Sequence, residues 1–209
     1  MRTAECGSVA RRISLAVIVI FAIVASPALA QKADRPEVKV GDEWQFMSYI
    51  VAPIQKPNLV WVITSVTPTG IAGTQNGKPL SLTPDLNVIE SPMRKFSDRR
   101  VLSFPLEIGK SWTYSNHTEF KDMGGAQRQD AGVTVAAYEK VTVPAGQYDA
   151  FKIETKGKFG QEGAAGAGAR EFTETTWYAP SARAVVKQVY RDPLIGERVL
   201  ELASFKLQP

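Results

Sequence analysis

The spacing of glycine and proline limits this chain to short secondary-structure elements. The 209 residues include 16 Gly and 13 Pro, and beyond residue 30 no stretch free of both exceeds about 14 residues. Pro lacks an amide N–H and Gly weakens a helix, so long helices have no room between these breaks. We therefore expect strands to dominate.

The segments between the breaks alternate apolar and polar residues, as half-buried strands do. In the segment 112–120, aromatic residues lie on one face, and Thr, Ser, His and Glu lie on the other. Asn76-Gly77 is the dipeptide of a tight hairpin turn. Only 91–100 is considered for a helical turn, on weak periodicity. Strand-like runs also occupy residues 44–51, 59–66, 70–75, 78–82, 132–138, 151–158, 172–179, 184–191 and 198–207. The pattern predicts an all-β fold, a mainly antiparallel curved sheet that forms a half-barrel or a sandwich.

The first thirty residues are typical of a secretory signal peptide. A basic start is followed by the apolar run 13–25 and by Ala28-Leu29-Ala30, which fits a signal-peptidase site. The run is shorter than the roughly 20 residues of a membrane span, so we expect cleavage after Ala30 and not an anchor. Cys6 precedes the apolar run and is therefore not expected to carry a lipid. The predicted location is the periplasm or the exterior of the cell.

Residues 31–209 are predicted to form one mature domain. Loss of the leader lowers the formal net charge from +4 to +2 and removes the single Cys, so no disulfide and no nucleic-acid partner are expected. The segments 38–46 and 106–114 share a pattern in which Gly is followed three positions later by Trp. This repeat raises the hypothesis of two related β-halves, 37–104 and 105–209, in which Trp44 and Trp112 each anchor part of the core. The alternative is one turn-plus-strand solution used twice.

The residues that could carry chemistry do not combine into a recognisable site. His117 is the only His, it lies on the polar face of its strand, and no G-x-S-x-G motif accompanies it. Glu171 and Glu174 are an odd number of positions apart, so a regular strand points them to opposite faces. The Gly-rich stretch 160–168 lacks the Lys-Ser/Thr of a phosphate loop and is predicted to be a hairpin connection. We therefore assign no catalytic, cofactor-binding or metal-ligating residue.

Two features leave room for a binding site. The segment 59–63 is apolar on both faces, so it is either covered on both sides or lines a cavity with one of them. The candidate residues for an apolar-ligand site or the core are the four tryptophans, Trp44, Trp61, Trp112 and Trp177. A second feature is a basic segment, predicted to be a solvated loop, with contact to anionic lipid headgroups or to a partner as the alternative; it contains Arg94, Lys95, Arg99 and Arg100.

Three motifs resemble a group of uncharacterised exported bacterial β-proteins. They are an F-P-L-x-x-G-K-x-W turn at 104–112, a V-P-A-G-x-[FY]-x-A-[FY]-x-I hairpin at 143–153, and a W-Y-A-P strand end at 177–180. The resemblance covers the C-terminal half, from Phe104 to Leu207. It implies a β-fold and export, and it brings no activity.

The sequence therefore favours a non-enzymatic envelope protein. Within that role, a carrier of an apolar ligand or lipid and a protein-interaction module both remain open. The alternative from another class is an envelope hydrolase that acts on glycan or ester. No cofactor is expected, and the mature chain is not expected to span a membrane.

Overall fold

The computed structural model describes residues 31–122, 124–161 and 168–209. The predicted signal peptide, its cleavage site and the centre of the Gly-rich stretch lie outside the described residues. The elements are β1 (Lys32–Ala33), β2 (Glu43–Ile50), β3 (Leu59–Thr67), β4 (Gly70–Gln75), β5 (Lys78–Leu82), β6 (Val88–Glu90), β7 (Arg94–Phe96), β8 (Leu106–Glu107), β9 (Ser111–Phe120), β10 (Ala126–Val143), β11 (Gly146–Gln161), β12 (Arg170–Ala179), the 3₁₀ helix η1 (Pro180–Ala182), β13 (Ala184–Asp192) and β14 (Gly196–Lys206).

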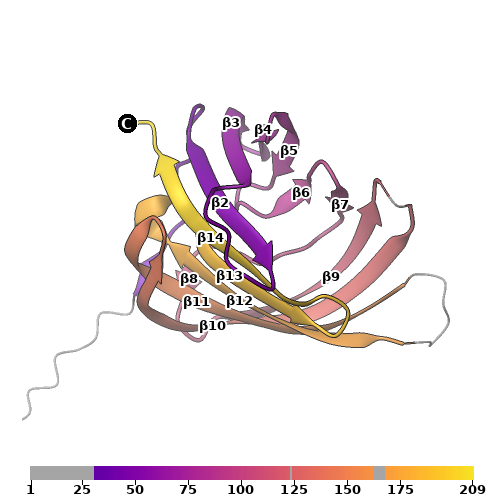
Figure 1. Ribbon diagram of the computed structural model, residues 1–209. Coiled ribbons are helices and arrows are strands. Elements are labelled where there is room, and N and C mark those ends of the chain that lie inside the picture. The colour runs from indigo at the N-terminus through magenta and orange to yellow at the C-terminus, as the bar shows by residue number, and fades with distance from the viewer. Residues whose placement is uncertain (1–30, 123, 162–167) are drawn as a thin grey trace, which may run out of the picture.

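Twelve of the strands form one antiparallel sheet that closes into a barrel. Neighbours along the chain pair with each other from β2 to β7 and from β9 to β14, β7 pairs with β9, and β14 returns to pair with β2. β1 and β8 form a separate two-stranded sheet. The all-β, antiparallel prediction is confirmed, and the curvature goes beyond a half-barrel because the first and last long strands meet. In Figure 1 the long strands β9–β14 sweep beneath the shorter β3–β7.

Tight turns and bulges give the sheet its shape. Asn76 and Gly77 have φ of 51° and 75°, and they connect β4 to β5 as a two-residue hairpin, as predicted. The hairpin between β10 and β11 closes around Pro144 and Ala145, with Val143 opposite Gly146. Register shifts interrupt several pairs, including β10 with β11 near Val135 and β14 with β2 near Leu202. Such bulges increase twist and bend a strand, which helps a sheet to close.

The connection between β7 and β8 folds back into one end of the barrel, and we name residues 97–105 the plug. Leu102 is 1% exposed and packs with inward-facing residues such as Val133, Phe151 and Ile153. The helical turn considered for 91–100 is wrong: residues 94–96 form strand β7, because Arg94, Lys95 and Phe96 pair with β9.

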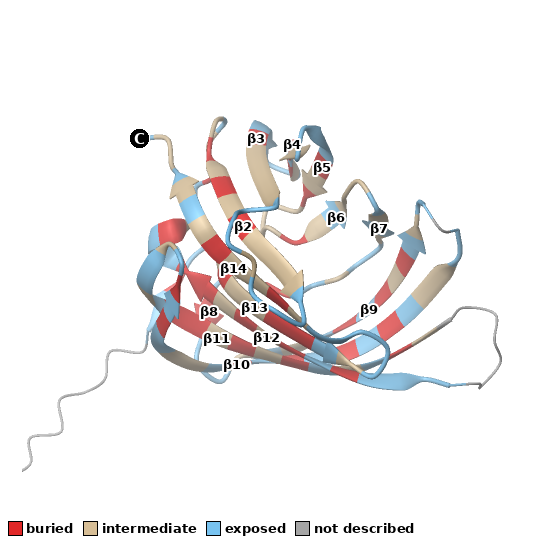
Figure 2. Cartoon of the chain, viewed as in Figure 1, coloured by how far each residue is buried: buried red, intermediate tan, exposed pale blue. Residues whose placement is uncertain are grey.

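Buried side chains alternate with exposed ones along the long strands, as the bands in Figure 2 show. They form two apolar clusters. One includes Trp44, Phe46, Leu80 and Leu202, and the other includes Tyr114, Phe151, Phe172 and Tyr178. The β10–β11 hairpin packs on the first cluster, and the amide of Ala145 in this hairpin donates a 3.0 Å hydrogen bond to the Leu202 carbonyl.

The two Gly-x-x-Trp turns have the same geometry. Gly41 and Gly109 have φ of 89° and 88°, a conformation that glycine adopts without strain. Each glycine amide donates a 2.8 Å hydrogen bond to a carbonyl of the strand that pairs with the one after the turn, that of Ile63 on β3 or Val135 on β10. Six barrel strands lie between the two turns and six follow the second. Both arrangements agree with the hypothesis of two related halves, which remains a prediction.

Candidate functional site: a cavity inside the barrel

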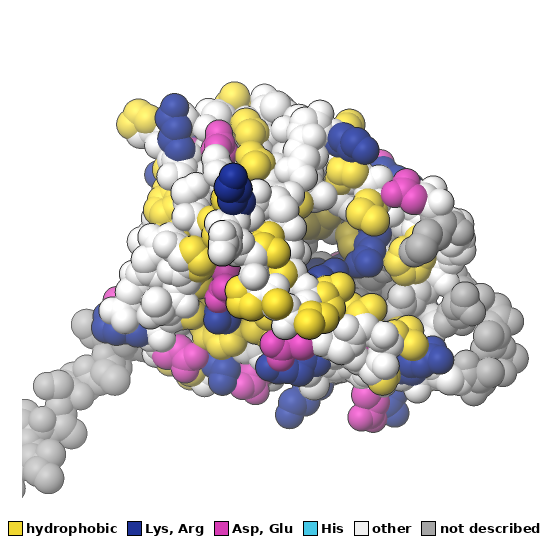
Figure 3. Space-filling model, in the orientation of Figure 1, with side chains coloured by type: hydrophobic (Ala, Val, Ile, Leu, Met, Phe, Trp, Pro, Cys, Tyr) yellow, Lys and Arg dark blue, Asp and Glu magenta, His cyan; other side chains and the backbone are white. Residues whose placement is uncertain are grey.

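A cavity of about 550 Å³ lies inside the barrel. Eight strands already give an interior that side chains can fill, so twelve strands enclose more space than their side chains occupy. The plug fills part of that space, and the cavity is what remains. Figure 3 shows a hollow in the face viewed, with apolar and basic side chains around it.

One part of the cavity wall is apolar and comes mainly from β2 and β3. Trp44, Phe46, Leu59 and Trp61 line it, and the rings of Phe46 and Trp61 meet edge to face with centroids 5.6 Å apart. Leu59 and Trp61 belong to the segment that is apolar on both faces. That segment therefore turns one apolar face toward the cavity, the second of the two arrangements considered for it.

The two tryptophans of this wall differ in their polar atoms. Trp44 is 2% exposed, and its Nε1 donates a 2.8 Å hydrogen bond to the carbonyl of Ala182, which ties β2 to η1. The Nε1 of Trp61 is buried and has no hydrogen-bond partner among the described residues. Trp44 is thus a fixed part of the wall, and Trp61 keeps an unused donor beside the cavity.

The other part of the wall is basic. Arg94 of β7, Arg99 of the plug and Arg198 of β14 all line the cavity. The guanidinium of Arg94 lies 5.4 Å from the ring centroid of Phe120, and that of Arg198 lies 5.4 Å from the centroid of Tyr190. Aromatic rings attract cations through their negative faces, so these contacts hold both guanidiniums in place.

Arg99 has a buried carboxylate as its partner. Its Nη2 donates to Glu174 Oε2, and the Glu174 side chain is fully buried. The other oxygen of Glu174 accepts hydrogen bonds from Gln188 Nε2 at 2.9 Å and from Thr176 Oγ1 at 3.3 Å. Buried charges are stable only when paired and hydrogen-bonded, and this network satisfies the Arg99–Glu174 pair.

The pKa shifts of the three arginines follow this arrangement. Burial alone would lower the pKa of Arg99, but the carboxylate of Glu174 raises it. For Arg94, burial and then the charges of Arg198 and Arg99 lower the pKa. For Arg198, burial and then the charge of Arg99 lower it. Arg94 and Arg198 therefore carry charge in a place that penalises it.

The sequence analysis predicted that Arg94 and Arg99 lie in a solvated loop, and this is wrong for both. Arg94 belongs to strand β7 and Arg99 to the plug, and both side chains reach the cavity wall, whereas Lys95 and Arg100 are exposed as expected. Arg198 was not considered, because in sequence it is an ordinary polar position of an alternating strand.

The remaining candidates lie away from the cavity. Trp112 is half-buried and donates a 2.8 Å hydrogen bond from Nε1 to the Arg100 carbonyl of the plug. Trp177 donates a 2.8 Å hydrogen bond from Nε1 to Glu139 on the neighbouring part of the barrel wall. The side chain of His117 is 36% exposed and lies 3.8 Å from Glu119 Oε1. Glu171 is exposed whereas Glu174 is buried, as their odd spacing predicts.

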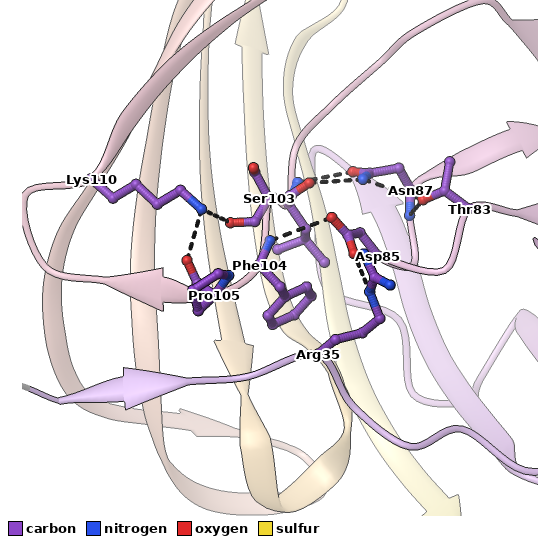
Figure 4. Close-up of polar contacts among 9 residues, drawn as sticks. Arg35, Thr83, Asp85, Asn87, Ser103, Phe104, Pro105 and Lys110 are labelled. Atoms are coloured by element: carbon purple, nitrogen blue, oxygen red, sulfur yellow. Dashed lines mark hydrogen bonds and ion pairs between the residues drawn. The ribbon is translucent and has the colours of Figure 1, made fainter. Parts of the chain in front are cut away.

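Several hydrogen bonds fix the plug that closes one end of the cavity. The amide group of Asn87 exchanges two 2.8 Å hydrogen bonds with the backbone of Leu102. Lys110 Nζ donates to the carbonyls of Ser103 and Pro105 at 2.6 and 2.8 Å, and Asp85 accepts from Arg35 and from the Phe104 amide (Figure 4). The plug is therefore a constructed part of the interior.

The cavity wall, as far as the structure describes it, contains no Asp, Glu or His. No group of three or more potential metal-ligating side chains occurs among the described residues. The wall thus presents apolar side chains, guanidinium groups and neutral polar groups such as those of Asn87 and Gln188.

The described part of the chain contains no helix with the length and hydropathy of a membrane span. No family model matches the sequence. No curated protein matches it either.

Solved structures do match. A candidate lipoprotein from Parabacteroides distasonis aligns with TM-score 0.55 at 11% identity, over 83% of this chain and 99% of its own. A candidate exported protein with a YmcC-like fold from Bacteroides fragilis aligns with TM-score 0.56 at 14% identity, over the same shares, 83% and 99%. The hypothetical lipoprotein YmcC from Escherichia coli aligns with TM-score 0.47 at 9% identity, over 80% of this chain and 85% of its own. The first two matches confirm the resemblance to uncharacterised exported β-proteins at the level of the fold, and this chain has a YmcC-like fold.

Proposed function

We propose that this protein is a non-enzymatic binding protein that holds an apolar group of a small molecule or lipid inside its barrel. The observation that carries the proposal is the cavity of about 550 Å³ with a wall of Trp44, Phe46, Leu59 and Trp61. Small-molecule sites typically have volumes of about 300–1,000 Å³ and mostly apolar walls with a few polar groups. Burial of apolar ligand surface against such a wall contributes roughly 25 cal/mol per Å².

The carrier role is favoured over the hydrolase. Hydrolysis of a glycoside needs two carboxylates that face the substrate, and hydrolysis of an ester needs a nucleophile with a base. The described wall has no carboxylate or His, and Glu174 lies behind it in a satisfied ion pair with Arg99. The carrier role is also favoured over a protein-interaction module, because an interior cavity is accessible to a small molecule and not to a folded partner.

The site of action that we propose is the cell envelope. The signal-like sequence of the first thirty residues supports export, and one of the matching structures is described as a candidate exported protein. Retention of an apolar molecule during purification from the periplasm would fit this location.

The test is binding of an uncharged apolar probe, 1-dodecanol, measured by calorimetry below its solubility limit. Leu59→Trp places a larger side chain in the cavity wall and should weaken binding by at least about tenfold, a loss of about 1.4 kcal/mol. Val66→Trp is the matched control on the same strand, because Val66 is 42% exposed and distant from the wall, and its binding should equal that of the unmodified protein.

Native mass spectrometry of protein purified from the periplasm gives the second readout. We expect an adduct of small-molecule mass that organic extraction removes. Absence of dodecanol binding in the unmodified protein, together with the absence of any adduct, would contradict the carrier function.

A further inference from the structure

Arg94 and Arg198 are cations in the cavity wall without an anionic partner. Among the described residues, two arginines of the wall form ion pairs with carboxylates: Arg99 with Glu174, and Arg183 with Asp42. No ion pair of the described chain includes Arg94 or Arg198, whose close contacts are instead the rings of Phe120 and Tyr190. The carboxylates of Glu174 and Asp192 act on Arg198 from beyond ion-pair distance and only partly offset its loss of hydration, and Glu174 already accepts hydrogen bonds from three donors.

This arrangement is unfavourable in the empty protein. Like charges repel more strongly where burial reduces screening, and a partly buried cation without a counter-ion loses hydration that nothing replaces. The lowered pKa values of Arg94 and Arg198 reflect the same burial and repulsion. Strand pairing, and not a partner, holds the two residues there: Arg198 lies opposite Ile50 on β2, and Arg94 lies opposite Phe120 on β9.

An oxyanion between the two guanidiniums would remove the imbalance. Guanidinium groups bind carboxylates and phosphates through paired N–H donors, and each charge-assisted hydrogen bond contributes about 1.5–3 kcal/mol. Phe120 and Tyr190 leave the edges of the two guanidiniums available, because cation–π contacts use the face and not the N–H groups.

We propose that the ligand of this barrel is an anionic amphiphile, whose carboxylate or phosphate binds Arg94 and Arg198 while its apolar chain lies against Trp44 and Trp61. This inference rests on the proposed carrier function and adds the chemical class of the ligand. Arg99 also lines the cavity, but it is not part of the anion site because its charge is neutralised by Glu174.

The experiment compares four probes with one chain length in the unmodified protein at pH 8 and below micelle-forming concentrations. They are dodecanoate, dodecyl phosphate, 1-dodecanol and dodecyltrimethylammonium. We expect the two anions to bind about 10- to 100-fold more tightly than the alcohol, which corresponds to one charge-assisted interaction. The cation should bind more weakly than the alcohol.

Variants then assign the preference to the two arginines. Arg94→Gln and Arg198→Gln, singly and together, should reduce the affinity for both anions toward that of the alcohol, and should reduce it by a larger factor than they change the affinity for the alcohol. Arg100→Gln is the matched control, because Arg100 lies in the plug but is exposed, and its Nη2 is 3.0 Å from Asp98 Oδ2. Arg94→Lys and Arg198→Lys keep the charge without the paired donors and should retain part of the preference.

The outcomes separate the two proposals. Equal affinity for anion, alcohol and cation would overturn the anionic ligand and leave the carrier function standing. Failure of all four probes to bind would overturn both. Binding of dodecyl phosphate that millimolar inorganic phosphate displaces, without any binding of the alcohol, would show a site for free phosphate and would also overturn the amphiphile. The comparison of probes in the unmodified protein decides the proposal even if a variant does not fold.

Discussion

At the scale of single residues, Gly157 controls how closely the strands approach inside the barrel. A Cβ at this position would lie 2.5 Å from the Asp130 carbonyl oxygen, 2.5 Å from the Phe172 ring and 2.7 Å from the Ala131 Cβ. The backbone of β10 and an interior ring would both have to move. The absence of a side chain here therefore allows Phe172 to stack on Tyr190, with ring centroids 5.5 Å apart.

We predict different effects on stability for two alanine substitutions in this part of the sheet. Gly157→Ala should lower the free energy of unfolding by about 1–3 kcal/mol or more, the usual cost of an overpacked core. Gly132→Ala on the adjacent strand meets nothing within 4 Å and should be neutral or stabilising by up to about 1 kcal/mol. Urea denaturation of both variants measures the difference, and equal effects would contradict the packing described for Gly157.

The alternation of apolar and polar residues predicts which side chains face inward only where a strand is regular. It placed His117 on the polar face and separated Glu171 from Glu174 correctly. It did not predict the direction of Arg94, because strand β7 has only three residues and shows no period. It did not predict that of Arg99 either, because the direction of a side chain in a loop depends on where the chain turns next. Nothing local in the sequence indicates that residues 94–96 form a barrel strand and that the plug, from residue 97 on, bends into the barrel.

At the scale of elements, the plug is held by side chains that are themselves buried. Asn87 is 8% exposed and satisfies both the N–H and the carbonyl of Leu102. Loss of its amide group would leave these two backbone groups of a buried residue without their partners. A buried unsatisfied polar group costs about 1–3 kcal/mol.

We therefore predict that Asn87→Ala lowers the free energy of unfolding by about 2–4 kcal/mol, as estimated from two such groups with partial relaxation. Asn58→Ala is a matched control, because Asn58 forms the same pair of hydrogen bonds with the backbone of Ser48 at an exposed site. Water replaces these bonds, so this variant should change stability by less than about 1 kcal/mol. Equal losses in urea melts would show that the plug is not an integral part of the interior.

The strands that could be predicted from the sequence are longer than those that could not. The long strands were predicted because six or more residues show an alternating pattern. The strands β1, β6, β7 and β8 have two or three residues each, which is too short for any period to appear. The pairing of β14 with β2 was not predictable either, because closure depends on bulges and twist accumulated around the whole sheet.

At the scale of the whole molecule, buried phenols couple the stability of the barrel to alkaline pH. Burial raises the pKa of Tyr114, Tyr178 and Tyr190 well above the ordinary value, and for Tyr190 the nearby Asp192 adds to it. Burial and a hydrogen bond to Glu201 raise the pKa of Tyr49 to about 12. An unfolded chain releases these protons near pH ~10.

The sign of the effect follows from proton binding. Above pH ~10 the unfolded chain holds fewer protons on these phenols than the folded barrel does. The free energy of unfolding must then fall as pH rises. The stabilisation is complete below that pH and is lost progressively as the pH approaches the raised values.

We therefore predict that Tyr114, Tyr178 and Tyr190 ionise only when the barrel unfolds. Absorbance at 295 nm, followed from pH 8 to 13 beside circular dichroism, should show their ionisation in a step that coincides with loss of the β-sheet signal. In denaturant, all six tyrosines should titrate near pH ~10.

The variant Tyr114→Phe tests the same coupling. The Tyr114 hydroxyl is buried without a hydrogen-bond partner among the described residues, so its removal should preserve stability at pH 7 and raise the pH at which half of the protein is unfolded. Reversible ionisation of the three phenols near pH ~10 with an intact sheet signal would contradict the closed, dry packing around them.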